Sequence, residues 1–139
     1  MRLSILLCAA LAACGGEPPE AEEHGHHAHS AVYGGVLVEI GDHLAQVELV
    51  HDPDTATVTA YVWDGHVEKP IFLTMDTIEL SVETGTVTLR PVEDPKTGDR
   101  KGHASKFVGK ADGLESIDGG TIRRIEISGR AFEAMEIGG

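Results

Sequence analysis

From Ala31 onward, apolar and polar residues alternate over short stretches, as in strands that bury one face. Val, Ile and Thr are frequent in these stretches and favour pleated strands. Turn-forming Gly, Asp and Pro residues at 41–42, 52–54 and 118–120 separate several of them. The pattern predicts strands over residues 36–40, 43–50, 55–63, 70–73, 77–83, 86–90, 105–109, 121–128 and 131–137.

Helical periodicity is weak along the same part of the chain, and residues 110–117 are the best candidate for a short helix. Many short strands at close spacing are typical of an all-β domain. We therefore expect a mostly antiparallel, immunoglobulin-like β-sandwich. Aromatic residues make up only 4% of the chain, so its core should consist mainly of Val, Ile, Leu and Ala.

The first 14 residues, MRLSILLCAALAAC, have the form of an export signal. Their apolar run, residues 3–13, is too short for a permanent membrane-spanning helix. Its end, Leu11-Ala12-Ala13-Cys14, resembles the lipobox of bacterial lipoproteins. The resemblance implies removal of residues 1–13 and acylation of Cys14 with chains such as palmitate. It also implies a periplasm-facing anchor in the cell envelope, and Gly15 favours the outer membrane. The alternative is an ordinary secretory signal that contains cysteines.

Residues 14–31 form the predicted tether between this anchor and the sandwich domain, residues 32–139. The segment 15–30 contains Gly, Pro, Glu and His, no Lys or Arg, and no apolar residue larger than Ala. Such a composition cannot bury enough surface to order the chain by itself, so we expect a flexible segment.

A histidine cluster ends the tether and is the strongest chemical signal of the chain: His24, His26, His27 and His29. Neutral imidazoles bind Zn, Cu(II) and Ni, and the four preceding glutamates add oxygen donors. We expect exchangeable chelation that protonation towards pH 5–6 reverses. The alternative is a solvated low-complexity linker that binds metal only incidentally.

A second, weaker group of metal ligands follows from the predicted hairpin of the second and third strands, residues 43–50 and 55–63. A turn at 52–55 would place His43 opposite Asp64 and bring Asp42, His43, Asp64 and His66 to one rim of the sheet. Two imidazoles and two carboxylates suffice for a Zn or Cu(II) site. Alternatively, the aspartates only cap turn amides. The other two histidines, His51 and His103, are expected to be single exposed residues.

Charge and cysteine content exclude several functions. The chain has 23 acidic against 11 basic residues and a net charge of −12, which disfavours nucleic acid as a partner. Both cysteines lie within residues 1–14, so the domain offers no thiolate ligand, disulfide or cysteine nucleophile. Motifs of serine hydrolases, P-loop proteins and zinc proteases are absent from the sequence. We expect a protein that is not an enzyme.

Residues 29–68 carry a resemblance to known envelope proteins. A His-rich leader precedes Gly34-Gly35, an apolar run and Gly41-Asp42-His43, followed by Val47-Glu48-Leu49 and Tyr61-Val62-Trp63-Asp64. This order resembles the small N-terminal β module of periplasmic adaptor subunits of heavy-metal efflux pumps, and stand-alone envelope lipoproteins of unknown function. The resemblance implies a metal-related envelope role without a ligand set. With 139 residues, the chain would be a detached module lacking the hairpin, lipoyl-like and barrel parts of an adaptor.

The sequence therefore predicts a lipid-anchored β domain that binds a divalent transition metal as a buffer, sensor or accessory to efflux. Its partners would be the membrane, through Cys14, and a metal-efflux or other envelope protein. The alternative is a structural or protein-interaction lipoprotein whose histidines have no physiological metal.

Overall fold

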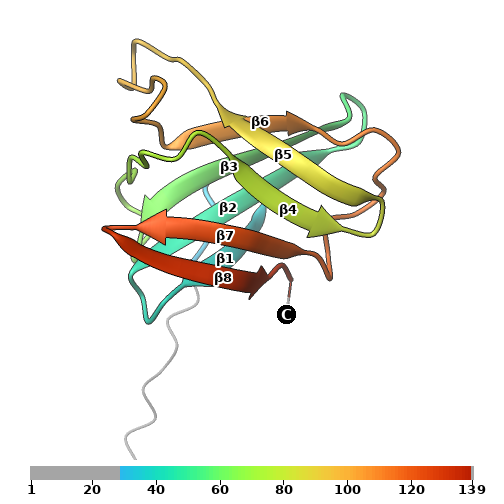
Figure 1. Cartoon of the computed structure of the whole chain (residues 1–139), viewed down its shortest axis with the longest axis horizontal. Helices are drawn as coiled ribbons and strands as arrows, with labels where there is room; N and C mark the ends of the chain where they lie inside the picture. The colour runs from blue at the N-terminus through green and yellow to red at the C-terminus, as the bar shows by residue number, and fades with distance from the viewer. Residues whose placement is uncertain (1–28, 139) are drawn as a thin grey trace, which may run out of the picture.

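A computed structural model describes residues 29–138, which form eight strands and contain no helix (Figure 1). The strands are β1 (Val36–Ile40), β2 (Ala45–Asp52), β3 (Thr57–Asp64), β4 (Ile78–Val82), β5 (Gly85–Pro91), β6 (Lys106–Lys110), β7 (Thr121–Ile127) and β8 (Arg130–Glu136). Within this range, accordingly, no helix has the length and apolar character that crossing a bilayer requires. The predicted signal sequence, Cys14 as the predicted lipidation site, and most of the predicted tether lie outside the described residues.

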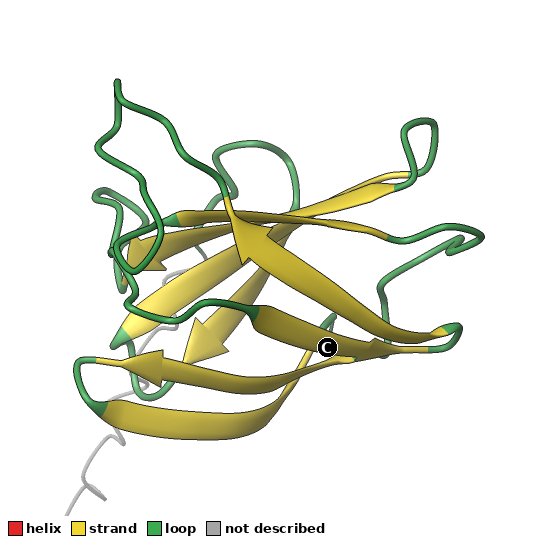
Figure 2. Cartoon of the chain, turned by 45° about the horizontal axis from the view of Figure 1, so that its top comes forward, coloured by secondary structure: helices red, strands yellow, loops and turns green. Residues whose placement is uncertain are grey.

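All eight strands belong to one antiparallel sheet in the order β1-β2-β3-β6-β5-β4-β7-β8, which confirms the all-β, antiparallel prediction for the described range. Strand β5 pairs with β4 along most of its length and with β6 at Arg90 and Pro91, so it connects the two halves of the sheet. The sheet curves over until β4, β7 and β8 face β3, β2 and β1 (Figures 1 and 2). Phe132 of β8 lies against Gly41 just after β1, so the sheet is nearly closed.

The core lies between these two layers and is built by the predicted alternation. In β3, Val58, Ala60 and Val62 are buried, whereas the residues between them are partly exposed. Phe107 is the one fully buried aromatic residue of the described chain, and aliphatic side chains supply the rest. Burial of these alternating side chains is the main driving force for folding.

Strand β2 departs from the alternation because both of its faces are buried. Ala45, Val47 and Leu49 face the core, while Gln46 and Glu48 on the opposite face are 3% and 0% exposed. The backbone N–H groups of Val32, Tyr33 and Gly35 donate to the carboxylate of Glu48, so this segment lies over the outer face of β2. The fold thus places the chain that follows the histidine cluster directly on the sheet.

Two predicted elements are wrong. Residues 70–73 make only the isolated bridges Trp63↔Pro70 and Leu73↔Ala104, because Pro70 has no N–H with which to continue a ladder. Residues 110–117 complete the end of β6 and then form turns rather than a helix.

The register of the β2–β3 hairpin also differs from the prediction. Ala45, not His43, lies opposite Asp64, and Asp52 pairs with Thr57 around a longer turn at 53–56. Ala56 closes this turn in the left-handed region, with φ of 51°, a conformation that the sequence pattern does not reveal. The shift is by two residues, so every side chain keeps its face of the sheet.

Candidate metal centre

Two turns meet at one end of β2 and form what we call the rim: residues 41–44, between β1 and β2, and residues 65–69, after β3. They share this end because β2 pairs antiparallel with both neighbours. Gly65 is buried and packs directly against the backbone carbonyl of His43, so the two turns are in contact. The four residues predicted for this rim do lie on these turns or directly before them.

Three histidines converge here. The ring of His29 lies 6.0 Å from that of His43 and 5.8 Å from that of His66, measured between centroids, with the rings in edge orientation. His29 is half-buried, whereas His43 and His66 are exposed. His29, the last residue of the histidine cluster, therefore lies beside both histidines of the rim. Sequence reasoning kept these residues in two separate groups.

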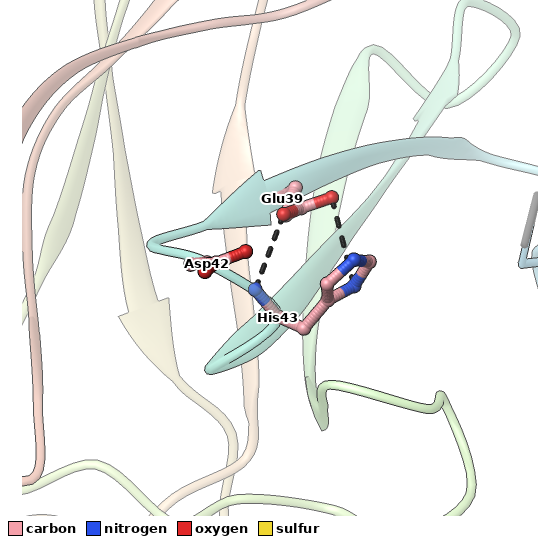
Figure 3. A group of neighbouring side chains, drawn as sticks. All are labelled: Glu39, Asp42 and His43. Atoms are coloured by element: carbon pink, nitrogen blue, oxygen red, sulfur yellow. Dashed lines mark hydrogen bonds and ion pairs between the residues drawn. The ribbon is translucent and has the colours of Figure 1, made fainter. Parts of the chain in front are cut away.

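Two carboxylates lie beside one of these histidines, His43. Glu39, Asp42 and His43 each offer a ligand atom within 4.8 Å of the others, and all three are exposed. Figure 3 shows Glu39 beside His43, where one carboxylate oxygen accepts the backbone N–H of His43 at 3.2 Å and the other lies 3.9 Å from Nδ1. Sequence reasoning missed Glu39, although its outward position in β1, four residues before His43, is a usable signal.

The two aspartates of the rim differ in their hydrogen bonds. The carboxylate of Asp64 accepts the backbone N–H of Glu68 at 2.8 Å, and this bond lowers the pKa of Asp64. The carboxylate of Asp64 thus caps an amide of its own turn, which is the alternative to metal binding that the sequence allows for the aspartates. Asp42 makes no side-chain hydrogen bond to any described residue, which leaves its oxygens available to a cation.

Both turns hold residues in the left-handed region, at φ of 52° for His43 and 61° for Val67. For β-branched Val67 this conformation is a true outlier. A bond of 3.0 Å from the N–H of Val67 to the carbonyl of Asp64 holds it in place. Local strain of this kind persists where surrounding contacts fix the backbone, and it is frequent at functional sites.

The remaining histidines lie away from the rim. His51, at the other end of β2, is half-buried; its Nε2 is buried and has no hydrogen-bond partner among the described residues. His103 is also half-buried and stacks on Phe72 at 4.3 Å between ring centroids. The expectation that both are simply exposed is therefore wrong. His24, His26 and His27 lie outside the described residues.

Models of protein families, curated proteins and solved structures were compared with the chain, and none matches. The resemblance to adaptor modules stays a prediction. A fold does not by itself define a function, so the chemistry of the rim is the feature that bears on function.

Proposed function

We propose that the protein is an envelope lipoprotein, anchored through Cys14, that binds a divalent transition metal ion at the rim and through the histidines before it. It would act as a buffer, sensor or accessory to metal efflux and would not be an enzyme. The observation that carries this proposal is the position of His29 beside both His43 and His66.

The spacing of the rings supports a shared ion. With Zn–N bonds of about 2.0–2.1 Å in tetrahedral geometry, two imidazole centroids on one zinc stand roughly 5 Å apart. The observed separations of 6.0 and 5.8 Å exceed this value by about 1 Å, which rotation of exposed side chains can close.

The types of donor support the class of metal. Up to three imidazole nitrogens with one carboxylate oxygen, from Asp42 or Glu39, suit Zn²⁺, Cu²⁺ and Ni²⁺. Ca²⁺ and Mg²⁺ prefer shells of oxygen atoms and gain little from imidazoles. Exposure of His43, Asp42 and Glu39 favours rapid exchange, as a buffer or delivery role requires.

Calorimetric titration of the purified full chain with Zn²⁺ tests the proposal. Replacing His43 and His66 together by Ala should weaken the rim site at least tenfold. Replacing His24, His26 and His27 by Ala should leave one Zn²⁺ per chain at the rim. His103→Ala, away from the rim against Phe72, is the matched control and should not change binding. Absence of specific Zn²⁺ binding in the unaltered chain would favour the structural or protein-interaction role.

A further inference from the structure

Glu48 is a fully buried carboxylate on the outer face of β2, at 0% exposure. It accepts backbone N–H groups of Val32 at 3.0 Å, Tyr33 at 2.6 Å and Gly35 at 3.1 Å. The indole Nε1–H of Trp63 donates a fourth bond at 3.3 Å. A buried carboxylate is tolerated only when its oxygens are satisfied in this way. Three of the four donors belong to residues 32–35, which we call the strap.

Aromatic stacking adds a second attachment for the strap. The ring of Tyr33 stacks on Tyr61 at 4.1 Å and faces Trp63 at 6.2 Å between centroids. Even so, Tyr33 remains 54% exposed and Val32 51% exposed. The strap is therefore held from one side only, by a carboxylate and an aromatic surface that both belong to the sheet.

Attachment of the strap limits how far His29 can lie from the sheet. Three Cα-to-Cα steps lead from Val32 back to His29, and an extended chain covers at most about 3.6 Å per step. Attachment of Val32 to Glu48 therefore confines His29 to within about 11 Å of that point. Release of the strap would free His29 to sample a much larger volume.

We propose that Glu48 is a positioning residue: it seats the strap on the sheet and thereby holds His29 beside His43 and His66, so that strap seating and metal binding are coupled. The inference rests on the proposed metal function and adds a regulatory link to it. A ligand held close to the other two has a high effective concentration, which strengthens binding. By thermodynamic linkage, metal binding holds the strap more firmly by the same factor.

The test uses the full chain in a background in which His24, His26 and His27 are replaced by Ala, so that only the rim binds. In Glu48→Gln, an NH₂ donor replaces one of the two acceptor oxygens and faces the N–H donors around it. Zn²⁺ affinity should fall at least tenfold. Hydrogen exchange at the amides of Val32, Tyr33 and Gly35 should accelerate.

A matched control distinguishes a purely structural role of Glu48 from a role in positioning His29. Asp99 is likewise buried, at 5% exposure, and its carboxylate accepts the amides of Ser105 and Lys106 away from the strap. Asp99→Asn should make unfolding easier but leave Zn²⁺ affinity unchanged. In the background chain, Zn²⁺ should slow hydrogen exchange at the strap amides. The factor of slowing should be about equal to the factor by which Glu48→Gln weakens Zn²⁺ binding.

A second variant displaces the strap without touching the carboxylate and carries the test if Glu48→Gln does not fold. In Gly35→Ala, the new Cβ would lie 2.8 Å from the carbonyl carbon of Leu49 and 2.9 Å from Cγ2 of Val50. It should also weaken Zn²⁺ binding and change the fluorescence of Trp63, the only tryptophan of the chain. If either folded variant binds Zn²⁺ as tightly as the background, the coupling is refuted while the metal function stands. If the background itself does not bind Zn²⁺, the proposed function fails, and the coupling with it.

Discussion

The packing of Gly65 against the backbone carbonyl of His43 supports both the fold and the candidate metal centre. Gly65 is buried, and a Cβ added there would stand 2.8 Å from the carbonyl carbon of His43 and closer still to its oxygen. Its φ lies outside the left-handed region, so Ala could adopt the same backbone conformation. The effect of Gly65→Ala should therefore come from this contact alone.

The size of the effect follows from the geometry. Ordinary contacts of a Cβ begin near 3.4 Å, so relieving the contact with the His43 oxygen requires the two turns to separate by roughly 1.5 Å. Overpacking of this kind costs about 1–3 kcal/mol of unfolding free energy. The imidazoles of His43 and His66 already have to rotate to reach one ion, so a further separation of their turns should lengthen or strain metal–ligand bonds that normally vary by only about 0.2 Å. We expect Zn²⁺ affinity to fall at least tenfold, or about 1.4 kcal/mol.

Urea unfolding and Zn²⁺ calorimetry measure the two effects, and Gly109→Ala provides the control. A Cβ at Gly109 would lie 2.7 Å from Cδ2 of Leu89 and 3.0 Å from the carbonyl carbon of Thr88, between β5 and β6. This variant should lose similar stability but keep its Zn²⁺ affinity. Unfolding of Gly65→Ala at the same urea concentration as the unaltered chain would show that this contact does not constrain the turns. Equal Zn²⁺ affinity of the two glycine variants would show that the contact does not support the metal site.

Three further predictions concern other parts of the chain. Burial alone would raise the pKa of Asp99, but hydroxyl donors and the amides of Ser105 and Lys106 lower this pKa overall. The ionised carboxylate of Asp99 therefore stabilises the fold fully above the ordinary pKa of 3.8, and this stabilisation is lost as the pH falls through the lower pKa of the folded state. Urea unfolding should therefore show Asp99→Asn to be about 1–3 kcal/mol less stable at pH 7, with a smaller difference near pH 2; an equal difference at both pH values would contradict this. Val67→Asn should raise the unfolding free energy by about 1 kcal/mol in the same assay, because Asn tolerates the left-handed φ of 61°; a loss of stability would argue against strain. Cys14→Ser should abolish lipid attachment, seen as loss of the acyl mass in mass spectrometry and of membrane association; a mass that falls only by the exchange of sulfur for oxygen would indicate an ordinary secretory signal.

The architecture was accessible to sequence reasoning where local pattern decides the structure. Alternation at Val58, Ala60 and Val62 correctly assigns the buried face of β3, because a strand with one face in the core must alternate. The gathering of Asp42, His43 and His66 at one end also followed, since antiparallel neighbours place their turns together. Register errors of two residues do not alter that placement.

Tertiary contacts decided the rest. Glu48 reads as an ordinary outward-facing residue of β2, and only the strap laid over it explains its complete burial. His29 belongs by sequence to the tether, yet the strap brings its ring to those of His43 and His66. The two-residue error in the hairpin arose from the left-handed Ala56, because Ala carries no turn signal.

The central claim is that one metal ion is bound jointly by His29, His43 and His66. The most direct test follows the imidazole nitrogens of each histidine by two-dimensional NMR during Zn²⁺ titration, with His24, His26 and His27 replaced by Ala. A shared site predicts that the imidazoles of His29, His43 and His66 shift together and saturate at one equivalent of Zn²⁺, while those of His51 and His103 do not change. Independent saturation of the three, or no shift at any of them, would contradict it.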